Sequence, residues 1–160
     1  MPKTVTLDHG ERLLVTQAGI IRRLHHIRRD TEDRWLKPRY GYFDTDIMAA
    51  GAEYVVAREM NAFWHAITDD NPRKLPGDCG IYQVRATEHK NGRLLLHPED
   101  DPKALFFFVT GEIPTFTIHG SMLASDGFDP IFWDETMPTP CYAVPQPGRG
   151  SPMEPYPRKT

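Results

Sequence analysis

The sequence predicts an α+β domain with some α/β character, in which a central mixed β-sheet is flanked by helices. At 160 residues and 39% hydrophobic content, the chain is long enough for one packed core and short for two. Helical periodicity fills the first sixty residues, whereas alternating and continuous apolar runs follow residue 80. We expect a single globular domain at residues 1–146 and a disordered Pro/Gly-rich C-terminal tail at residues 147–160.

The first expected element is an amphipathic, basic helix at about residues 11–30. Its apolar positions lie close to the helical period, at Leu13, Leu14, Ala18, Ile20, Ile21, Leu24 and Ile27. Four arginines lie among them: Arg22, Arg23, Arg28 and Arg29. Such a cluster is more often a solvated helix face than a DNA footprint, but its density also suits contact with phosphate. These four arginines are therefore our candidate nucleic-acid-binding residues.

A second helix is expected to begin near Thr45 or Asp46, because either side chain can cap a helix. Within it, Glu53 follows the sequence AAGA and precedes YVVA, so an acidic residue lies in an otherwise apolar stretch. If Glu53 is buried, its carboxylate needs a partner or an ion. The alternative is an ordinary solvent-facing helix residue.

The rest of the chain reads as strands joined by turns. The stretch DDNPRKLPGD has turn chemistry, and alternation in IYQVRAT indicates a half-buried strand. The stretch ALFFFVTG is apolar almost throughout and suits a sheet covered on both faces. Further strands are expected at GRLLLHP and PTFTIHGSM, a short helical turn at SDGFDPIFW, and an edge strand at PCYAVPQ. An edge strand can pair with a copy of itself, which would give a homodimer.

The stretch DCGIYQVR contains the side-chain types of a site for phosphodiester hydrolysis. Mg²⁺ prefers oxygen ligands and is usually held by one or two carboxylates, for which Asp78 and Glu53 are the candidates. Gln83 and Arg85 are two residues apart on the predicted strand and therefore share a face. Gln83 offers a neutral oxygen to Mg²⁺ or Mn²⁺, and the fork of Arg85 can face the developing charge on phosphorus.

Less specific interpretations of the same residues stay open. Asp78 lies beside Gly77 and Gly80, as an ordinary turn aspartate would. Gln83 and Arg85 have the pattern of an exposed face on an edge strand. The seven histidines lack the spacing of zinc ligands, and the two cysteines are too few for a disulfide framework.

Five pieces of the sequence carry a resemblance to a known family: DIMAAGAEYVVAREMNAFW, DCGIYQVRAT, GRLLLHP, FFFVTGEIPTFTIHG and PCYAVPQ. In this order they resemble a group of small phage-type proteins that are similar to the PD-(D/E)XK, or restriction-endonuclease-like, nuclease superfamily. By this resemblance, Glu53 is the acidic residue of the first core helix and Asp78 is the metal-binding aspartate. Gln83 and Arg85 take the place of the E-x-K pair. The resemblance implies a restriction-endonuclease-like fold and a Mg²⁺-dependent hydrolase that cleaves DNA.

Two departures from the family pattern keep other functions open. Gln83 replaces a carboxylate, and Arg85 replaces a lysine but stays protonated and cannot act as a base. The alternatives are a catalytically inactive nuclease-fold module that binds DNA or protein, and a structural protein of the virion. We expect DNA as a partner, with phage or host proteins as further partners. We expect a cytoplasmic location, in the host if the chain is phage-encoded, and no membrane association, because no apolar run approaches about 20 residues.

Overall fold

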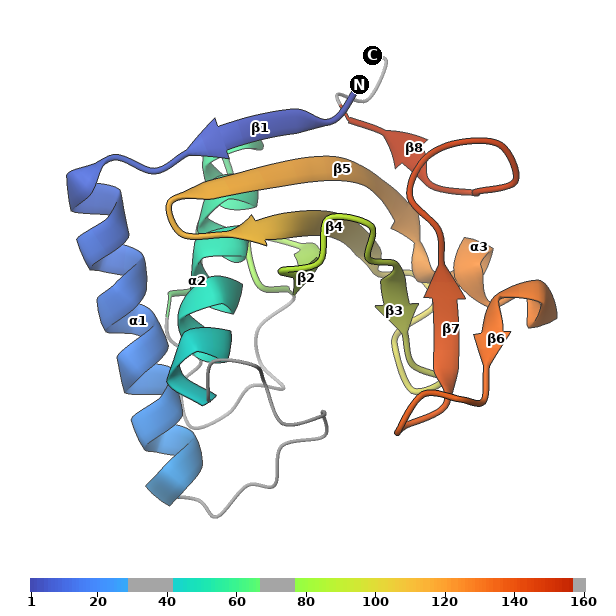
Figure 1. The fold of residues 1–160 in the computed structure, drawn as a ribbon, viewed down its shortest axis with the longest axis horizontal. Helices are drawn as coiled ribbons and strands as arrows, with labels where there is room; N and C mark the ends of the chain where they lie inside the picture. Colours follow the sequence, from blue (N-terminus) through green and yellow to red (C-terminus); the bar gives the residue numbers. More distant parts are fainter. Residues whose placement is uncertain (29–41, 67–76, 157–160) are drawn as a thin grey trace.

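The fold is built around a mixed β-sheet, with helices on one face and a smaller sheet on the other (Figure 1). The computed structural model describes residues 1–28, 42–66 and 77–156. Within them, the elements are β1 (Lys3–Thr6), α1 (His9–Arg28), α2 (Tyr42–Glu59), β2 (Tyr82–Thr87), β3 (Leu94–Leu96), β4 (Leu105–Glu112), β5 (Thr115–Leu123), α3 (Ala124–Gly127), the 3-10 turn η2 (Pro130–Phe132), β6 (Trp133–Asp134), β7 (Cys141–Val144) and β8 (Glu154–Pro155).

The large sheet has the strand order β1-β5-β4-β2, with β8 paired to the end of β5. Strands β2 and β4 run parallel, whereas the other pairs of this sheet are antiparallel. The smaller sheet, in the order β3-β7-β6, is antiparallel. This arrangement confirms the predicted α+β class and the mixed sheet flanked by helices. It also makes β2, the strand that follows Asp78, an outer strand of the large sheet among the described residues.

The long helices pack against each other and against the large sheet (Figure 1). Helix α1 begins earlier than expected because Asp8 and Glu11 form a capping box, in which each side chain accepts a 2.8 Å hydrogen bond from the other's backbone N–H. Helix α2 begins at Tyr42, ahead of both predicted caps. Gly19 permits the close approach of the helices, since a Cβ there would lie 2.5 Å from the Cα of Ile47.

Strand β4 has buried side chains on both faces, as its continuous apolar sequence predicted. Phe107 and Val109 belong to the core under the helices, whereas Phe106 and Phe108 belong to the core under the smaller sheet. The large sheet is therefore a middle layer between the two cores, and Val84 of β2 belongs to the core under the helices.

Two expectations about the C-terminal third are wrong. The segment PCYAVPQ was expected to be an edge strand, but β7 lies between β3 and β6. The expected disordered tail contains β8, and its Met153 and Tyr156 are buried in the two cores. Apolar anchors among the prolines thus hold this segment against β5. The predicted turn DDNPRKLPGD, except for its last two residues, lies outside the described residues.

Among the residues that the structure describes, no helix has both the length and the apolar character needed to cross a membrane.

Candidate active site

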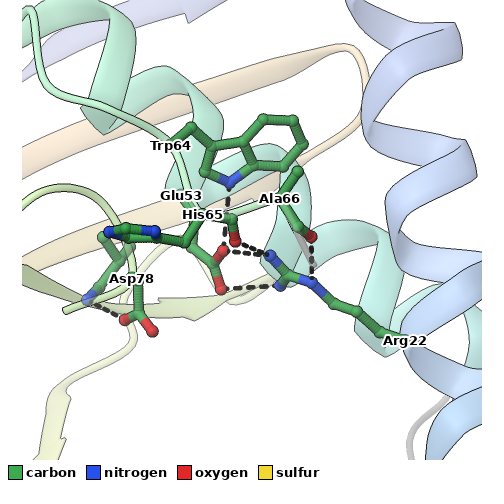
Figure 2. A network of polar contacts seen from close by, with 7 residues as sticks. Arg22, Glu53, Trp64, His65, Ala66 and Asp78 are labelled. Atoms are coloured by element: carbon green, nitrogen blue, oxygen red, sulfur yellow. Dashed lines mark hydrogen bonds and ion pairs between the residues drawn. The ribbon is translucent and has the colours of Figure 1, made fainter. Parts of the chain in front are cut away.

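Glu53 is buried between the two long helices, where Arg22 of α1 binds it with both guanidinium branches (Figure 2). The Nη1 atom donates to Oε1 at 2.9 Å and the Nη2 atom donates to Oε2 at 2.6 Å. Both side chains are only about a tenth exposed, at 10% and 11%. The indole N–H of Trp64 donates to Oε2 at 3.3 Å. The expected burial of Glu53 is confirmed. The bidentate contact of Arg22 compensates part of the cost of burying the carboxylate charge.

The burial of Arg22 and Arg23 makes the prediction that they form an exposed phosphate-binding surface wrong. Besides Glu53, Arg22 donates to the backbone carbonyls of Ala66 at 2.8 Å and His65 at 3.3 Å. Arg23 pairs with Asp46 at 2.6 Å, and both side chains are mostly buried. The arginines instead join α1 to α2 and to the segment that follows α2. The side chain of Arg28 and the whole of Arg29 lie outside the described residues.

Asp78 is brought to this cluster by a short antiparallel contact between residues 63–66 and the turn before β2. Trp64 bridges Cys79, and the N–H of His65 donates to the carbonyl of Asp78 at 3.2 Å. The turn then closes between Cys79 and Tyr82, with Gly80 at a φ of 56°, which glycine adopts without strain. The aspartate thus lies at the start of the outer strand, beside the end of the segment that contacts Arg22.

The carboxylate of Asp78 caps the beginning of β2. Its Oδ2 atom accepts a 2.7 Å hydrogen bond from the N–H of Val84. Burial raises the pKa of Asp78, and the charges of Arg85, Arg22 and His65 oppose that rise. One oxygen of Asp78 therefore has the role expected of an ordinary turn aspartate, which accepts a hydrogen bond from the nearby backbone. Among the described residues, no hydrogen bond reaches its other oxygen, Oδ1.

The two carboxylates influence each other electrostatically. Burial raises the pKa of Glu53 to about 7, and the negative charge of Asp78 adds to the rise, although Arg22 and Trp64 oppose it. Two buried carboxylates that repel each other favour a proton or a cation between them. Raised carboxylate pKa values of this kind are frequent at functional sites, although buried structural ion pairs also produce them.

Gln83 and Arg85 share a face of β2, as predicted, but it is the opposite face from the one that meets α2. Val84 belongs to the core under the helices, whereas the neighbours of Gln83 and Arg85 on β4 are Phe106 and Phe108, on the other face. Arg85 donates to Asp100 at 2.9 Å and lies over the ring of Phe106. Arg85 still acts on Asp78, because that aspartate lies at the outer edge of the strand.

The structure therefore brings Glu53 and Asp78 together and places Arg85 on the far side of Asp78. It adds residues that the sequence did not single out, namely Trp64, His65 and Asp100. Trp64 and His65 are adjacent and do not have the spacing of metal ligands in the sequence. The contact of Asp100 with Arg85 joins residues fifteen positions apart, so it depends on how the chain folds between them. Pairing of this kind has no periodic signature in the sequence.

The donor set suits Mg²⁺ better than zinc. Among the described residues, no group of three or more His, Cys, Asp and Glu side chains is arranged to hold a metal ion. Mg²⁺ does not need such a group, since one or two carboxylates with water and substrate phosphate suffice. The fit is good at Asp78, where one oxygen is available, and tighter at Glu53, where Arg22 and Trp64 already use both oxygens.

Comparison with known proteins leaves the function to be argued from this geometry. No family model, curated protein or solved structure matches the chain.

Proposed function

We propose that the chain is a Mg²⁺- or Mn²⁺-dependent phosphodiesterase that cleaves DNA, with Glu53 and Asp78 as the metal-holding carboxylates. The main support is that both carboxylates are buried beside Arg22, one from a helix and one from the start of an outer strand, so that the charge of Asp78 adds to the raised pKa of Glu53. Their mutual repulsion favours a cation at this position. The order of a helical glutamate, an aspartate and a strand with paired polar residues also agrees with the nuclease resemblance of the sequence.

Each residue has a distinct part in this proposal. Val84 fixes one oxygen of Asp78, so the other oxygen is left for the ion. Arg22 and Trp64 hold the carboxylate of Glu53 in one orientation. Arg85 supplies positive charge that acts on Asp78. Gln83 has no part in this site, because it lies on the face of β2 opposite to the one that meets α2. A bound ion would polarise the phosphate and lower the pKa of an attacking water.

Plasmid nicking in Mg²⁺ and in Mn²⁺ tests this proposal. We expect Asp78→Asn and Glu53→Gln to lower the nicking rate by about 100-fold or more, since even outer-shell partners of a metal site are worth about 10- to 100-fold. The matched controls are Asp126→Asn and Glu112→Gln, which change exposed carboxylates in α3 and at the end of β4. Wild-type nicking by Asp78→Asn would contradict the proposal.

A second candidate function is an inactive nuclease-fold module that binds DNA or a protein. It is favoured by the bidentate contact of Arg22, which occupies both oxygens of Glu53, and by Gln83 and Arg85 in place of a carboxylate and a lysine. Under this alternative the wild-type protein neither nicks plasmid nor binds Mg²⁺, and Asp78→Asn binds DNA as the wild type does. These results separate the two candidates.

A further inference from the structure

The large apolar side chains of helix α1 lie on its exposed face. Leu13 is 54% exposed, Leu14 and Leu24 are each 45% exposed, and Ile20 is 38% exposed. A helix on the surface of a globular protein normally turns such residues inward and leaves polar residues outside. Contiguous apolar residues on an exposed face mark a surface that something else covers. We call this the outer face of α1, and it also includes the exposed Gln17.

The opposite side of α1 already packs against α2. It buries Val15 and Ala18 in the core under the helices. The only charged residues of the stretch 13–24, Arg22 and Arg23, also lie on this side, where they pair with carboxylates of α2. In Figure 1, α1 lies at the margin of the molecule, on the side of α2 away from the smaller sheet. The outer face is therefore uncharged over about three helical turns.

The spacing of the residues on the outer face suits a second helix. Leu13, Gln17, Ile20 and Leu24 follow one another at intervals of four, three and four residues. This alternation keeps the side chains on one line along the helix, and it is the spacing at which two helices pack in a coiled coil. The intervals are the same when read in either direction. Two antiparallel copies of α1 can therefore meet with Leu13 of each copy beside Leu24 of the other, which is the self-complementary contact of a two-fold dimer.

The lack of charge separates the possible occupants of this face. A partner that recognises opposite charge has nothing to pair with between residues 13 and 24, since both arginines there are buried. Helices that lie on a membrane surface carry many lysines and arginines on their polar side, whereas this chain has a formal net charge of -3. A second copy of the chain brings an uncharged apolar face of matching spacing, so it fits best.

We propose that two copies of the chain pair through the outer face of α1, in antiparallel orientation. Gln17 then lies close to the two-fold axis, where its amide can both donate to and accept from the same residue of the partner copy. The helix has 20 residues. A contact along it covers about 30 Å by 10 Å, which is small beside the roughly 800 Å² per partner of a stable complex. We therefore expect a weak, concentration-dependent dimer. The inference depends on α1 alone and not on the proposed metal site.

Analytical ultracentrifugation of the full chain over a concentration series tests the pairing. The wild type should pass from monomer to dimer as its concentration rises. Ile20→Lys should raise the dissociation constant by about 100-fold or more, because each dimer would bury two lysines without partners. The control is Ile131→Lys, which places the same charge at an exposed isoleucine of η2 and should dimerise as the wild type does. Circular dichroism checks that both variants keep the fold.

Cysteine cross-linking tests the orientation separately. When Leu13→Cys and Leu24→Cys proteins are mixed with a mild oxidant, the mixed disulfide should form faster than either homodimeric one. The native Cys79 and Cys141 are buried.

Four results would overturn the proposal. They are a wild type that stays monomeric at every concentration, an Ile20→Lys variant that pairs as the wild type does, faster formation of the two homodimeric disulfides, and a monomeric wild type that binds phosphatidylcholine–phosphatidylserine vesicles through this face. The last result would assign the outer face to a membrane surface.

Discussion

Removal of Arg22 should expose how much of the fold depends on the buried pair with Glu53. In Arg22→Met the carboxylate loses both bidentate bonds and keeps only the indole N–H of Trp64. Breaking a buried ion pair by removing one partner costs about 3–5 kcal/mol at a pH where the remaining carboxylate stays charged, because that charge is then buried without compensation. The total stability of a domain is about 5–15 kcal/mol, so this single substitution removes a large part of it.

Urea denaturation at pH 9, above the pKa of about 7 that burial gives Glu53 in the wild type, measures this cost. The double variant Arg22→Met/Glu53→Met should recover most of the loss, because replacing both charges with apolar side chains leaves no uncompensated group. The control Arg93→Met breaks the surface pair with Asp134, where the arginine side chain is 51% exposed, and should change the midpoint little. The deficit of Arg22→Met should shrink toward pH 5, because Glu53 without Arg22 protonates more readily. A loss below about 1 kcal/mol, or a double variant no more stable than the single one, would refute this reasoning.

Two further predictions follow from the same contacts. Burial raises the pKa of Glu53 from its ordinary 4.5 to about 7, so the folded state binds its proton more tightly than the unfolded state. The contribution of Glu53 to stability should therefore fall as pH rises from about 4.5 to about 7 and level off above, and thermal melts of Glu53→Gln across this range should show a flatter profile. Gly19→Ala should destabilise by about 1–3 kcal/mol in urea, despite the better helix propensity of alanine, because the new Cβ meets the backbone of Ile47. An unchanged urea midpoint would mean that the helices can separate at no cost.

The elements whose apolar residues recur in a regular pattern were predictable from the sequence. The continuous apolar run of β4 records that both of its faces are covered. The apolar positions predicted for the covered face of α1 are partly wrong, because Leu13, Leu14, Ile20 and Leu24 are exposed, whereas Arg22 and Arg23 are buried. The burial of Glu53 was also indicated, since its neighbours in the chain are apolar. In each case the information lies within a few residues.

The parts that depend on distant pairing were not predictable. Nothing local to Arg22 says that it meets Glu53, a residue 31 positions later, instead of phosphate. A solvated arginine and a buried one have the same sequence neighbours, and only the crossing of two helices distinguishes them. The position of β7 between two other strands and the anchoring of Met153 similarly depend on partners elsewhere in the chain.

The candidate site shows the same division. Glu53 was a candidate because its sequence neighbours are apolar, and Asp78 was a candidate because the family resemblance places the metal-binding aspartate there. The roles of Trp64 and His65 were not, because the short contact between residues 63–66 and the turn before β2 is what places them at the cluster. The contact of Arg85 with Asp100 likewise requires the loop after β3 to return to β2.

Calorimetric titration of Mg²⁺ and Mn²⁺ into the wild type, Asp78→Asn and Asp126→Asn tests the central claim most directly. The account predicts that the wild type and Asp126→Asn bind both ions, and that Asp78→Asn loses binding while its circular dichroism spectrum is unchanged. Equal binding by all three proteins, or no binding by the folded wild type, would contradict the assignment of Asp78 and Glu53 as metal-holding carboxylates.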